Sequence, residues 1–203
     1  VYSKSDVSQI KVDEALNELN WAISNLELKV ISVQSFEATP FTGNVNLSVE
    51  GSVGWAHYGL SSATSFNQKE GSNRFTALEV TGPEGLRMVS DSQIVVSWND
   101  GVPTKEASNI TNASWLRGIG NSISFKAKIS GTEAQRLRVY TTTWKAKGKL
   151  EVLSLNEDGS TTPLVTESGK PAAGYVDSPY GNSYYVWTVD FKPSGHGEKT
   201  VVV

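Results

Sequence analysis

The side chains of this chain that are best suited to chemistry are aromatic rings next to amides, carboxylates and lysines. Flat aromatic faces stack on the apolar face of a sugar ring, and polar side chains around them hold its hydroxyls. Three stretches combine the two types of side chain. They contain Trp55, His57 and Tyr58; Trp144, Lys145 and Lys147; and, within the tyrosine-rich segment 175–185, Tyr175, Asp177 and Tyr180. We predict sugar-binding surfaces at these three places, and they need not form one site.

The segment 138–153 predicts a β-hairpin that presents the second of these surfaces. It is β-branched and aromatic up to Trp144, and an alternation of apolar residues resumes after Gly148. Because glycine adopts positive φ without strain, we place Gly148 at the tight position of a turn over residues 145–149. Three lysines of this turn then project into water, with the indole at its base.

Composition fixes the broad class of the chain. Its 203 residues are 38% hydrophobic and 19% charged, which is enough apolar material for a core and too little charge for a disordered chain. The net charge of −3 offers no basic field for phosphates, so we expect no nucleic-acid partner. No apolar run approaches the roughly 18 to 20 residues that span a bilayer, so we expect no membrane insertion.

Catalytic signatures are scarce. The chain has no cysteine and only two histidines, His57 and His196, and isolated imidazoles are more often structural than catalytic. It contains no nucleophile elbow, no zinc-binding helix motif and no phosphate-binding loop. A pair of glycosidase carboxylates leaves no local signature, because its members meet only in space. We predict that the protein is not an enzyme, and keep a glycoside hydrolase as the least favoured alternative.

One amphipathic helix is predicted over residues 8–28. Five apolar residues step by four and three positions, which places them along one seam of a helix. They are Val12, Leu16, Leu19, Ile23 and Leu26. A helix of this length cannot bury its seam alone, so we expect it to pack on the following domain or to belong to a helical bundle.

The helical run 12–26 resembles the final helix of a FIVAR module, a small helical spacer of bacterial surface and secreted proteins. Its valine, alanine, leucine and isoleucine positions match, and Trp21 stands where that family more often has alanine or a charged residue. We assign residues 1–29 to the end of such a spacer, or to a helix packed on the next domain, and residues 30–203 to a β-sandwich module.

The rest of the chain predicts a mainly β fold. From residue 28 onward, short alternating segments are separated by glycine, proline and asparagine turn signals, with no second helix. A dozen short strands without intervening helices fit an antiparallel β-sandwich or jelly roll. The expected strands are 28–33, 44–49, 53–58, 74–80, 94–98, 114–119, 122–129, 137–144, 149–155, 162–166, 184–191 and 198–203.

Four motifs of the β region are similar to β-sandwich modules of large secreted bacterial polysaccharide-degrading enzymes. They are Gly-Trp-Ala-His-Tyr-Gly-Leu at 54–60, Val-Ser-Trp-Asn-Asp-Gly-Val-Pro at 96–103, Gly-Ile-Gly-Asn at 118–121 with Phe125, and Leu-Arg-Val-Tyr at 137–140 followed by residues 144–151. The family's first motif usually reads Asp-Trp-x-His-Trp-Gly, so Gly54 and Tyr58 depart from it, and Gly54 removes one carboxylate that could bind a hydroxyl. The resemblance implies a galactose-binding-like jelly roll, a secreted or cell-surface location, and either sugar binding or a passive spacer role.

The same resemblance implies a structural calcium ion as an option, because such modules often hold one with backbone carbonyls and one or two carboxylates. Carboxylates of the kind required are Asp91, Asp100, Asp177 and Asp190. No Asp-x-Asp-x-Asp-Gly loop is present, so the sequence designates no complete set of ligands. We therefore name no metal-binding residue and no certain cofactor.

These observations predict a noncatalytic carbohydrate-binding accessory module of a multimodular extracellular bacterial enzyme. Its expected partners are a polysaccharide or glycan and the neighbouring modules of the same polypeptide, since a chain that starts at Val1 rather than Met is expected to be part of a longer one. The alternative is a structural or adhesive spacer that binds no sugar. Exposure of Trp55 and Trp144 separates the two, because a binding module presents an indole to solvent and a spacer buries it.

Overall fold

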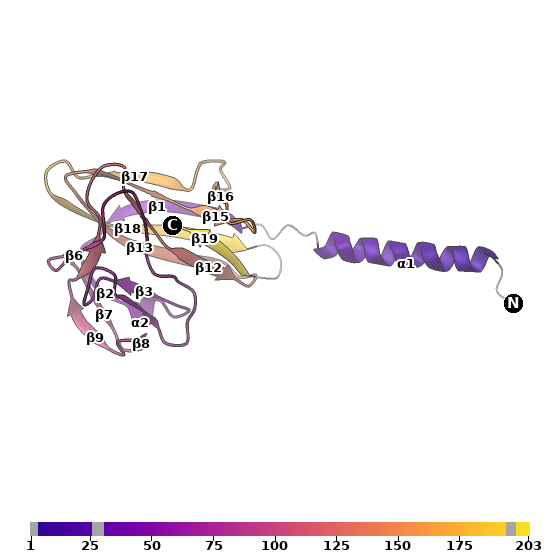
Figure 1. The fold of residues 1–203 in the computed structure, drawn as a ribbon, viewed down its shortest axis with the longest axis horizontal. Helices are drawn as coiled ribbons and strands as arrows, with labels where there is room; N and C mark the ends of the chain where they lie inside the picture. The colour runs from indigo at the N-terminus through magenta and orange to yellow at the C-terminus, as the bar shows by residue number, and fades with distance from the viewer. Residues whose placement is uncertain (1–3, 26–30, 194–197) are drawn as a thin grey trace.

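The computed structural model describes residues 4–25, 31–193 and 198–203. In the helix over residues 4–25, side chains are described for residues 9–20. This part of the chain is mainly β, as the sequence predicts (Figure 1). Its helices are α1 (Lys4–Asn25) and α2 (Leu47–Glu50). Its strands are β1 (Ile31–Pro40), β2 (Gly43–Asn46), β3 (Ala56–Tyr58), β4 (Phe66–Lys69), β5 (Glu79–Thr81), β6 (Arg87–Val89), β7 (Ile94–Trp98), β8 (Gly101–Val102), β9 (Ala107–Ile110), β10 (Ala113–Trp115), β11 (Ser122–Ser124), β12 (Lys126–Ser130), β13 (Gln135–Trp144), β14 (Lys147–Glu151), β15 (Leu153–Leu155), β16 (Thr161–Pro163), β17 (Ala173–Asp177), β18 (Asn182–Pro193) and β19 (Glu198–Val202).

A three-stranded antiparallel sheet, β1-β18-β13, lies between two hydrophobic cores. β18 is its central strand and pairs along its length with both neighbours. Successive side chains of a strand point to opposite faces, so Trp187, Val189 and Phe191 face one core and Tyr184 faces the other. β-Branched and aromatic residues dominate this strand because they fit a pleated surface that is packed on both sides.

The larger core joins the odd-numbered face of β18 to two other sheets. The four-stranded sheet β12-β19-β15-β16 and the two-stranded sheet β14-β17 contribute to it through residues such as Ile129, Val201 and Leu150. Phe191 is fully buried here, and burying a phenylalanine side chain stabilises a fold by about 1.5 to 3 kcal/mol. This core therefore supplies much of the hydrophobic stabilisation of the β domain.

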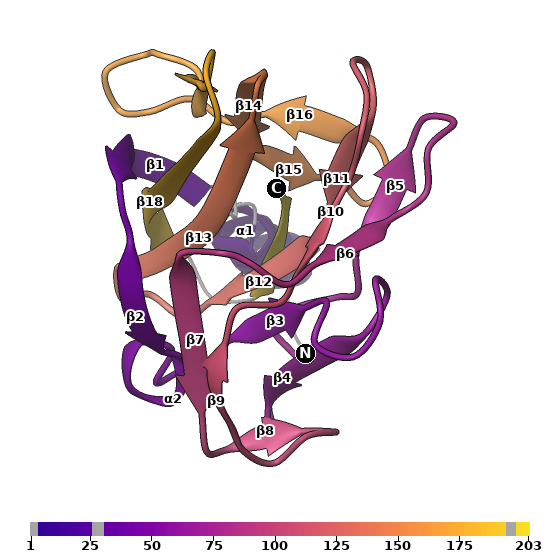
Figure 2. The ribbon, with the colours of Figure 1, turned by 90° about the vertical axis from the view of Figure 1, so that its left-hand side faces the viewer.

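The smaller core lies against the opposite face of the same sheet. Val45 of β2, Ile94 and Trp98 of β7, and Trp55 pack there with Tyr184. Figure 2 shows β14, β15 and β16 at the top of the view and β2, β7, β8 and β9 below them. The sheets thus form packed layers, as in a β-sandwich, whereas the jelly-roll strand order stays a prediction.

The local pairings differ from the predicted string of antiparallel strands in one ladder. β2 runs parallel to β7, with Gly43 opposite Ile94 and Asn46 opposite Ser97. The crossover between β2 and β7 is a long segment that carries the short helix α2 and the strands β3 to β6, rather than a single long helix. All other ladders among the described strands are antiparallel.

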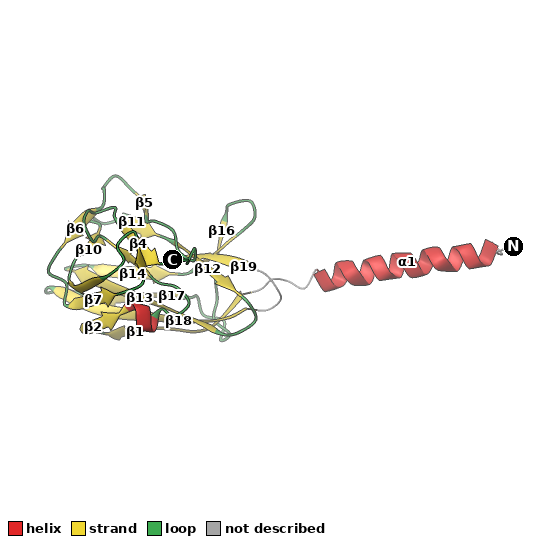
Figure 3. Ribbon diagram, turned by 90° about the horizontal axis from the view of Figure 1, so that it is seen from below, coloured by secondary structure: helices red, strands yellow, loops and turns green. Residues whose placement is uncertain are grey.

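The predicted amphipathic helix corresponds to α1, which begins four residues before the predicted start. Its described apolar residues are more than half exposed, including Val12, Leu16 and Leu19. Figure 3 shows α1 apart from the strands, so the described part of its seam does not pack on the β domain as one alternative expected. Predicted helical residues 26–28 lie outside the described residues, as does His196. Neither described helix combines the length and apolar character needed to cross a membrane.

The sequence also predicted one strand, 44–49, that the structure divides. The strand ends at Asn46, whose side-chain oxygen accepts a hydrogen bond of 3.3 Å from the Val49 N–H and so caps the short helix α2. A helix after residue 28 was not expected, and this is the physical reason for it. By contrast, the predicted strand 94–98 corresponds residue for residue to β7.

Candidate functional site

The segment around Trp144 is a corner between two sheets rather than a hairpin. β13 ends at Trp144 and pairs with β18, whereas β14 starts three residues later and pairs with β17. The hairpin predicted over 138–153 is therefore wrong. The left-handed residue of the turn is Lys145, with a φ of 45°. Gly148 lies inside β14, where an added Cβ would come within 2.8 Å of the Thr143 hydroxyl oxygen, so its role is close packing.

The two strands that pair with the strands of this corner, β17 and β18, are joined by residues 178–181. The Lys145 N–H donates to the Gly181 carbonyl at 3.1 Å, which ties this connection to the corner. The Ser178 N–H donates to the Ala146 carbonyl at 3.1 Å, and the Ser178 side chain is buried. The structure thus brings two of the three predicted surfaces, the Trp144 turn and the 175–185 segment, into one region.

Three aromatic side chains stand exposed along this region. Trp144, Tyr175 and Tyr180 are 59%, 61% and 93% exposed. The Nζ atom of Lys145 lies 5.2 Å from the Trp144 ring centroid, and that of Lys147 lies 4.7 Å from the Tyr175 ring centroid. These are the distances of cation–π contacts. We call these five residues the aromatic ridge.

Strand alternation explains why part of the ridge faces solvent. In the β14-β17 ladder, Leu150 and Val176 are buried in the larger core, so their neighbours in each strand point outward. Lys147 pairs with Asp177, and Tyr175 lies two residues before Asp177 on the same outer face. Asp177 is therefore exposed beside the ridge, as predicted for a residue that could meet a ligand.

An open groove of about 610 Å³ lies next to Asn182, the cross-strand partner of Trp144. We call this cavity the groove. It is lined by Pro40, Phe41, Thr42, Gln93, Asn182, Ser183, Tyr184 and Tyr185. Trp144 and Asn182 are directly opposite each other in the β13-β18 ladder, and side chains of such partners lie on the same face with Cβ atoms about 4.5 to 5.5 Å apart. Trp144 is therefore the direct neighbour of a residue that lines the groove.

Backbone hydrogen bonds hold the walls of the groove together. The Phe41 N–H donates to the Tyr184 carbonyl at 3.0 Å, and the Gly43 N–H donates to the Gln93 carbonyl at 3.0 Å. The Phe41 ring also packs edge-on against Tyr140, with 5.3 Å between the ring centroids. These contacts join the end of β1, the segment before β7 and the start of β18, so the groove is part of the folded framework.

The third predicted surface is not available to a ligand. Trp55 is 3% exposed and His57 is buried, and both rings pack against Trp98 with centroid distances of 5.2 Å. Tyr58 is partly buried, stacks on Phe66, and donates its hydroxyl to the Thr76 carbonyl at 2.8 Å. The expectation that Trp55, His57 and Tyr58 present a sugar-binding face is therefore corrected. Their rings serve internal packing.

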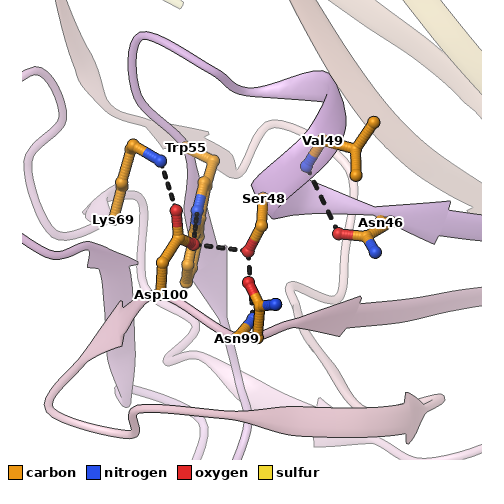
Figure 4. Close-up of polar contacts among 7 residues, drawn as sticks. All are labelled: Asn46, Ser48, Val49, Trp55, Lys69, Asn99 and Asp100. Carbon is orange, nitrogen blue, oxygen red and sulfur yellow. Dashed lines mark hydrogen bonds and ion pairs between the residues drawn. The ribbon is translucent and has the colours of Figure 1, made fainter.

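A polar network explains how the indole of Trp55 is accommodated in the smaller core (Figure 4). Its Nε1–H donates to Asp100 Oδ1 at 2.9 Å, and the Ser48 hydroxyl donates to the same oxygen. The Lys69 ammonium donates to Asp100 Oδ2. Ser48 also accepts a hydrogen bond from the Asn99 N–H at 3.0 Å. We call Ser48, Trp55, Lys69 and Asp100 the Asp100 network.

The electrostatics of this network favour an ionised carboxylate. Partial burial acts to raise the pKa of Asp100, but hydrogen bonds from Lys69, Ser48 and Trp55 outweigh it and lower the pKa to about 2. An acceptor surrounded by three donors, one of them a cation, is suited to fix the positions of β4, α2 and the β7-β8 turn. It has no proton to give or take near neutral pH, so the network is structural.

Burial also removes His57 from the set of candidate bases. Desolvation lowers the pKa of His57 below its ordinary value, against the opposing effect of a hydrogen bond with the Asn112 carbonyl. The Nε2 atom lies 3.0 Å from that carbonyl oxygen, and Nδ1 is buried without a hydrogen-bond partner. A neutral imidazole enclosed in this way cannot reach a substrate.

The carboxylates considered for calcium are distributed over the molecule. The described residues contain no group of three or more His, Asp or Glu side chains placed to hold a metal ion. Both oxygens of Asp100 are occupied by donors, and Asp190 accepts two hydrogen bonds from Arg136 and one from Ser35. Asp91 and Asp177 belong to different strands and loops. A structural calcium ion therefore gains no support from these side chains.

Several residues of the groove were missed in the sequence. Phe41, Thr42 and Gln93 have no local pattern that points to a ligand, and the fold alone places them beside Asn182. Asn182 and the two tyrosines that follow it lie inside the predicted segment 175–185, so a signal existed for that wall. No protein-family model, curated protein or solved structure matches the chain.

Proposed function

We propose that the protein is a noncatalytic carbohydrate-binding module whose glycan lies in the groove and against the aromatic ridge. The observation that carries the proposal is the exposed indole of Trp144 next to the groove residue Asn182. An indole with most of its surface in water costs free energy that a stacked sugar ring would recover. Trp144 has the exposure expected of a binding module, whereas Trp55 does not.

The chemistry of the groove supports the same proposal. Its volume falls within the range of about 300 to 1,000 Å³ that is usual for ligand sites. Phe41 and Tyr185 supply apolar ring surface, and the amides of Gln93 and Asn182 each supply donors and an acceptor for hydroxyl groups. Such a mixture of rings and amides is suited to a hydroxyl-rich ligand with apolar C–H faces.

The groove also favours binding over hydrolysis. Its lining residues include no carboxylate and no imidazole among those that the structure describes. Glycoside hydrolysis requires two carboxyl groups about 5 to 10 Å apart across the scissile bond. A ligand held in the groove would therefore meet no such pair of carboxyl groups.

A binding screen of the purified module on a broad glycan array tests the proposal. Trp144→Ala and Asn182→Ala are expected to lose the binding seen for the wild type, because they remove the stacking face and the adjacent amide. Trp115→Ala is the matched control, since Trp115 is a half-buried tryptophan on β10, outside the groove. Circular dichroism and cooperative thermal unfolding show that each variant is folded. Glycan binding that survives both Trp144→Ala and Asn182→Ala would overturn this site.

A structural spacer is the second candidate function. The observation that favours it is the burial of Trp55, the residue of the first sequence motif that most resembles a binding aromatic. A spacer requires a rigid β domain and no ligand. If the wild-type module binds no glycan on the array, with and without calcium, the spacer becomes the better account.

A further inference from the structure

We infer that the ligand of the aromatic ridge is an acidic polysaccharide, whose carboxylate or sulfate groups meet Lys145 and Lys147. This inference rests on the proposed function and specifies its class of ligand. Its basis is that an ammonium group lies against each of two exposed rings. Two of the three rings of the ridge, Trp144 and Tyr175, therefore have a positive charge beside them.

The ammonium groups of these two lysines are available for a ligand. Within the part of the chain that the structure describes, neither Lys145 nor Lys147 forms an ion pair, whereas the nearby Lys149 pairs with Glu151 at 2.8 Å. A lysine already paired with a carboxylate gains less from a second anion. Strand β14 and the turn before it thus carry two lysines that can bind an anion and one, Lys149, that is already paired.

The backbone restricts where the first ammonium can lie. Lys145 occupies the left-handed region at the corner, and its N–H is bonded to the Gly181 carbonyl. Its side chain folds back over the Trp144 ring, so a sugar stacked on the free face or edge of that indole brings its substituents toward the ammonium. Lys147 stands in the same relation to Tyr175. Ring and cation are therefore presented as pairs.

The charge around the ridge differs in sign from that of the whole chain. The chain has a net charge of −3. Near the ridge, Lys145 and Lys147 outnumber the single carboxylate of Asp177, while Lys149 and Glu151 cancel each other. Charges beyond about 8 Å are largely screened at physiological salt, so a ligand at the ridge senses these local groups. Lys145 and Lys147 therefore give an acidic polymer a local attraction that the net charge of the chain does not provide.

The two ring–lysine pairs are presented by different sheets. Trp144 ends β13, which pairs with β18, and Tyr175 belongs to β17, which pairs with β14. Each pair is therefore tested by its own lysine variant.

Paired polymers that differ only in charge test the inference. The probes are polygalacturonate against its fully methyl-esterified form, and dextran sulfate against dextran, with retardation in affinity gels and titration calorimetry as readouts. The wild type is expected to bind at least one acidic polymer more tightly than its neutral counterpart. Lys145→Met and Lys147→Met should each weaken that binding about two- to fivefold, the range of an exposed ion pair. Lys105→Met removes the same charge from an exposed lysine between β8 and β9, outside the ridge, and should leave the affinity unchanged.

The outcomes separate this inference from the proposed function. If neutral and acidic forms bind equally and the lysine variants have no effect, the acidic class is wrong while carbohydrate binding at the ridge stands. If the wild type binds none of the four polymers and nothing on the glycan array, both fail. If all three lysine variants weaken binding equally and Trp144→Ala does not, the attraction is diffuse charge rather than a site, and the inference is overturned.

Discussion

Replacement of Asp100 by asparagine would measure what the Asp100 network contributes to stability. The change keeps the size of the side chain and an oxygen that can accept from Ser48 and the Trp55 indole. It removes the negative charge that the Lys69 ammonium faces, and the new NH₂ group places a donor against a donor. The free energy of unfolding is therefore expected to fall, mainly through the loss of the Lys69 contact.

The pKa of Asp100 sets the magnitude of this loss. The folded-state value is about 2, against an ordinary value of 3.8. A difference of this size corresponds to about 2.4 kcal/mol of preferential stabilisation of the ionised form. Because the Asp100 side chain is 30% exposed and that of Lys69 is 23% exposed, solvent screening reduces it. We expect a loss of about 1 to 2 kcal/mol at pH 7.

The pH dependence distinguishes this mechanism from a simple packing defect. A depressed folded-state pKa contributes stability that is present above the unfolded value of 3.8 and is lost as the pH falls from about 4 to about 2. The difference in unfolding free energy between the wild type and Asp100→Asn should therefore be constant from pH 7 to pH 5. It should shrink toward zero below pH 4.

Urea unfolding followed by tryptophan fluorescence at several pH values is the assay, with cooperative transitions as the condition for extracting free energies. Asp91→Asn is the control, because this substitution removes the same charge from an exposed residue. A double-mutant cycle with Lys69→Met isolates the pair, and its coupling energy should account for most of the loss. A destabilisation that is the same at pH 7 and pH 2.5, or a coupling energy near zero, would refute the reasoning.

Two further predictions concern positions buried by the fold. Burial lowers the pKa of His57, so the imidazole of the unfolded chain binds a proton more readily than that of the folded chain. The free energy of unfolding should therefore decline as the pH falls below 6.5. NMR titration of the His57 ring should give a pKa below 6.5, and His57→Gln should lessen the decline. Gly59 has a φ of 90°, and an added Cβ would lie 2.3 Å from the Ala113 carbonyl carbon. Gly59→Ala should therefore lower the free energy of unfolding by more than about 1 kcal/mol in the same urea assay, whereas Gly85→Ala, where a Cβ meets nothing within 4 Å, should not.

The sequence predicted those features that depend on local periodicity. The alternation of apolar residues identified β7 residue for residue, and the four-and-three spacing identified α1. Short polar strands such as β4 and β9 were missed, because their residues carry little hydrophobic pattern and are held by pairing with neighbours. The composition of segment 175–185 identified its exposed tyrosines, but strand β17, which carries Tyr175, was not predicted.

Long-range packing decided what the sequence left open. Alternation places Trp55 and His57 on one face of a strand, but it does not tell which face another sheet covers. In the structure Trp98 and the Asp100 turn lie over that face, so the densest aromatic cluster of the sequence is internal. The groove could not be predicted from the sequence for the same reason, since Phe41, Gln93 and Asn182 come together only in the folded chain.

The contrast between the two tryptophans bears directly on function. Trp55 packs on Trp98 and donates its indole N–H to Asp100, so the fold itself accounts for its presence. Trp144 is mostly exposed and adds little to either core, and the exposed Tyr180 lies on the connection bonded to the same corner. Large aromatic side chains gathered at one corner of a surface, beside a groove, mark an interaction site more often than chance exposure. The two cores do not account for the exposed Trp144 and Tyr180, whereas the proposed glycan, stacked on their rings, would.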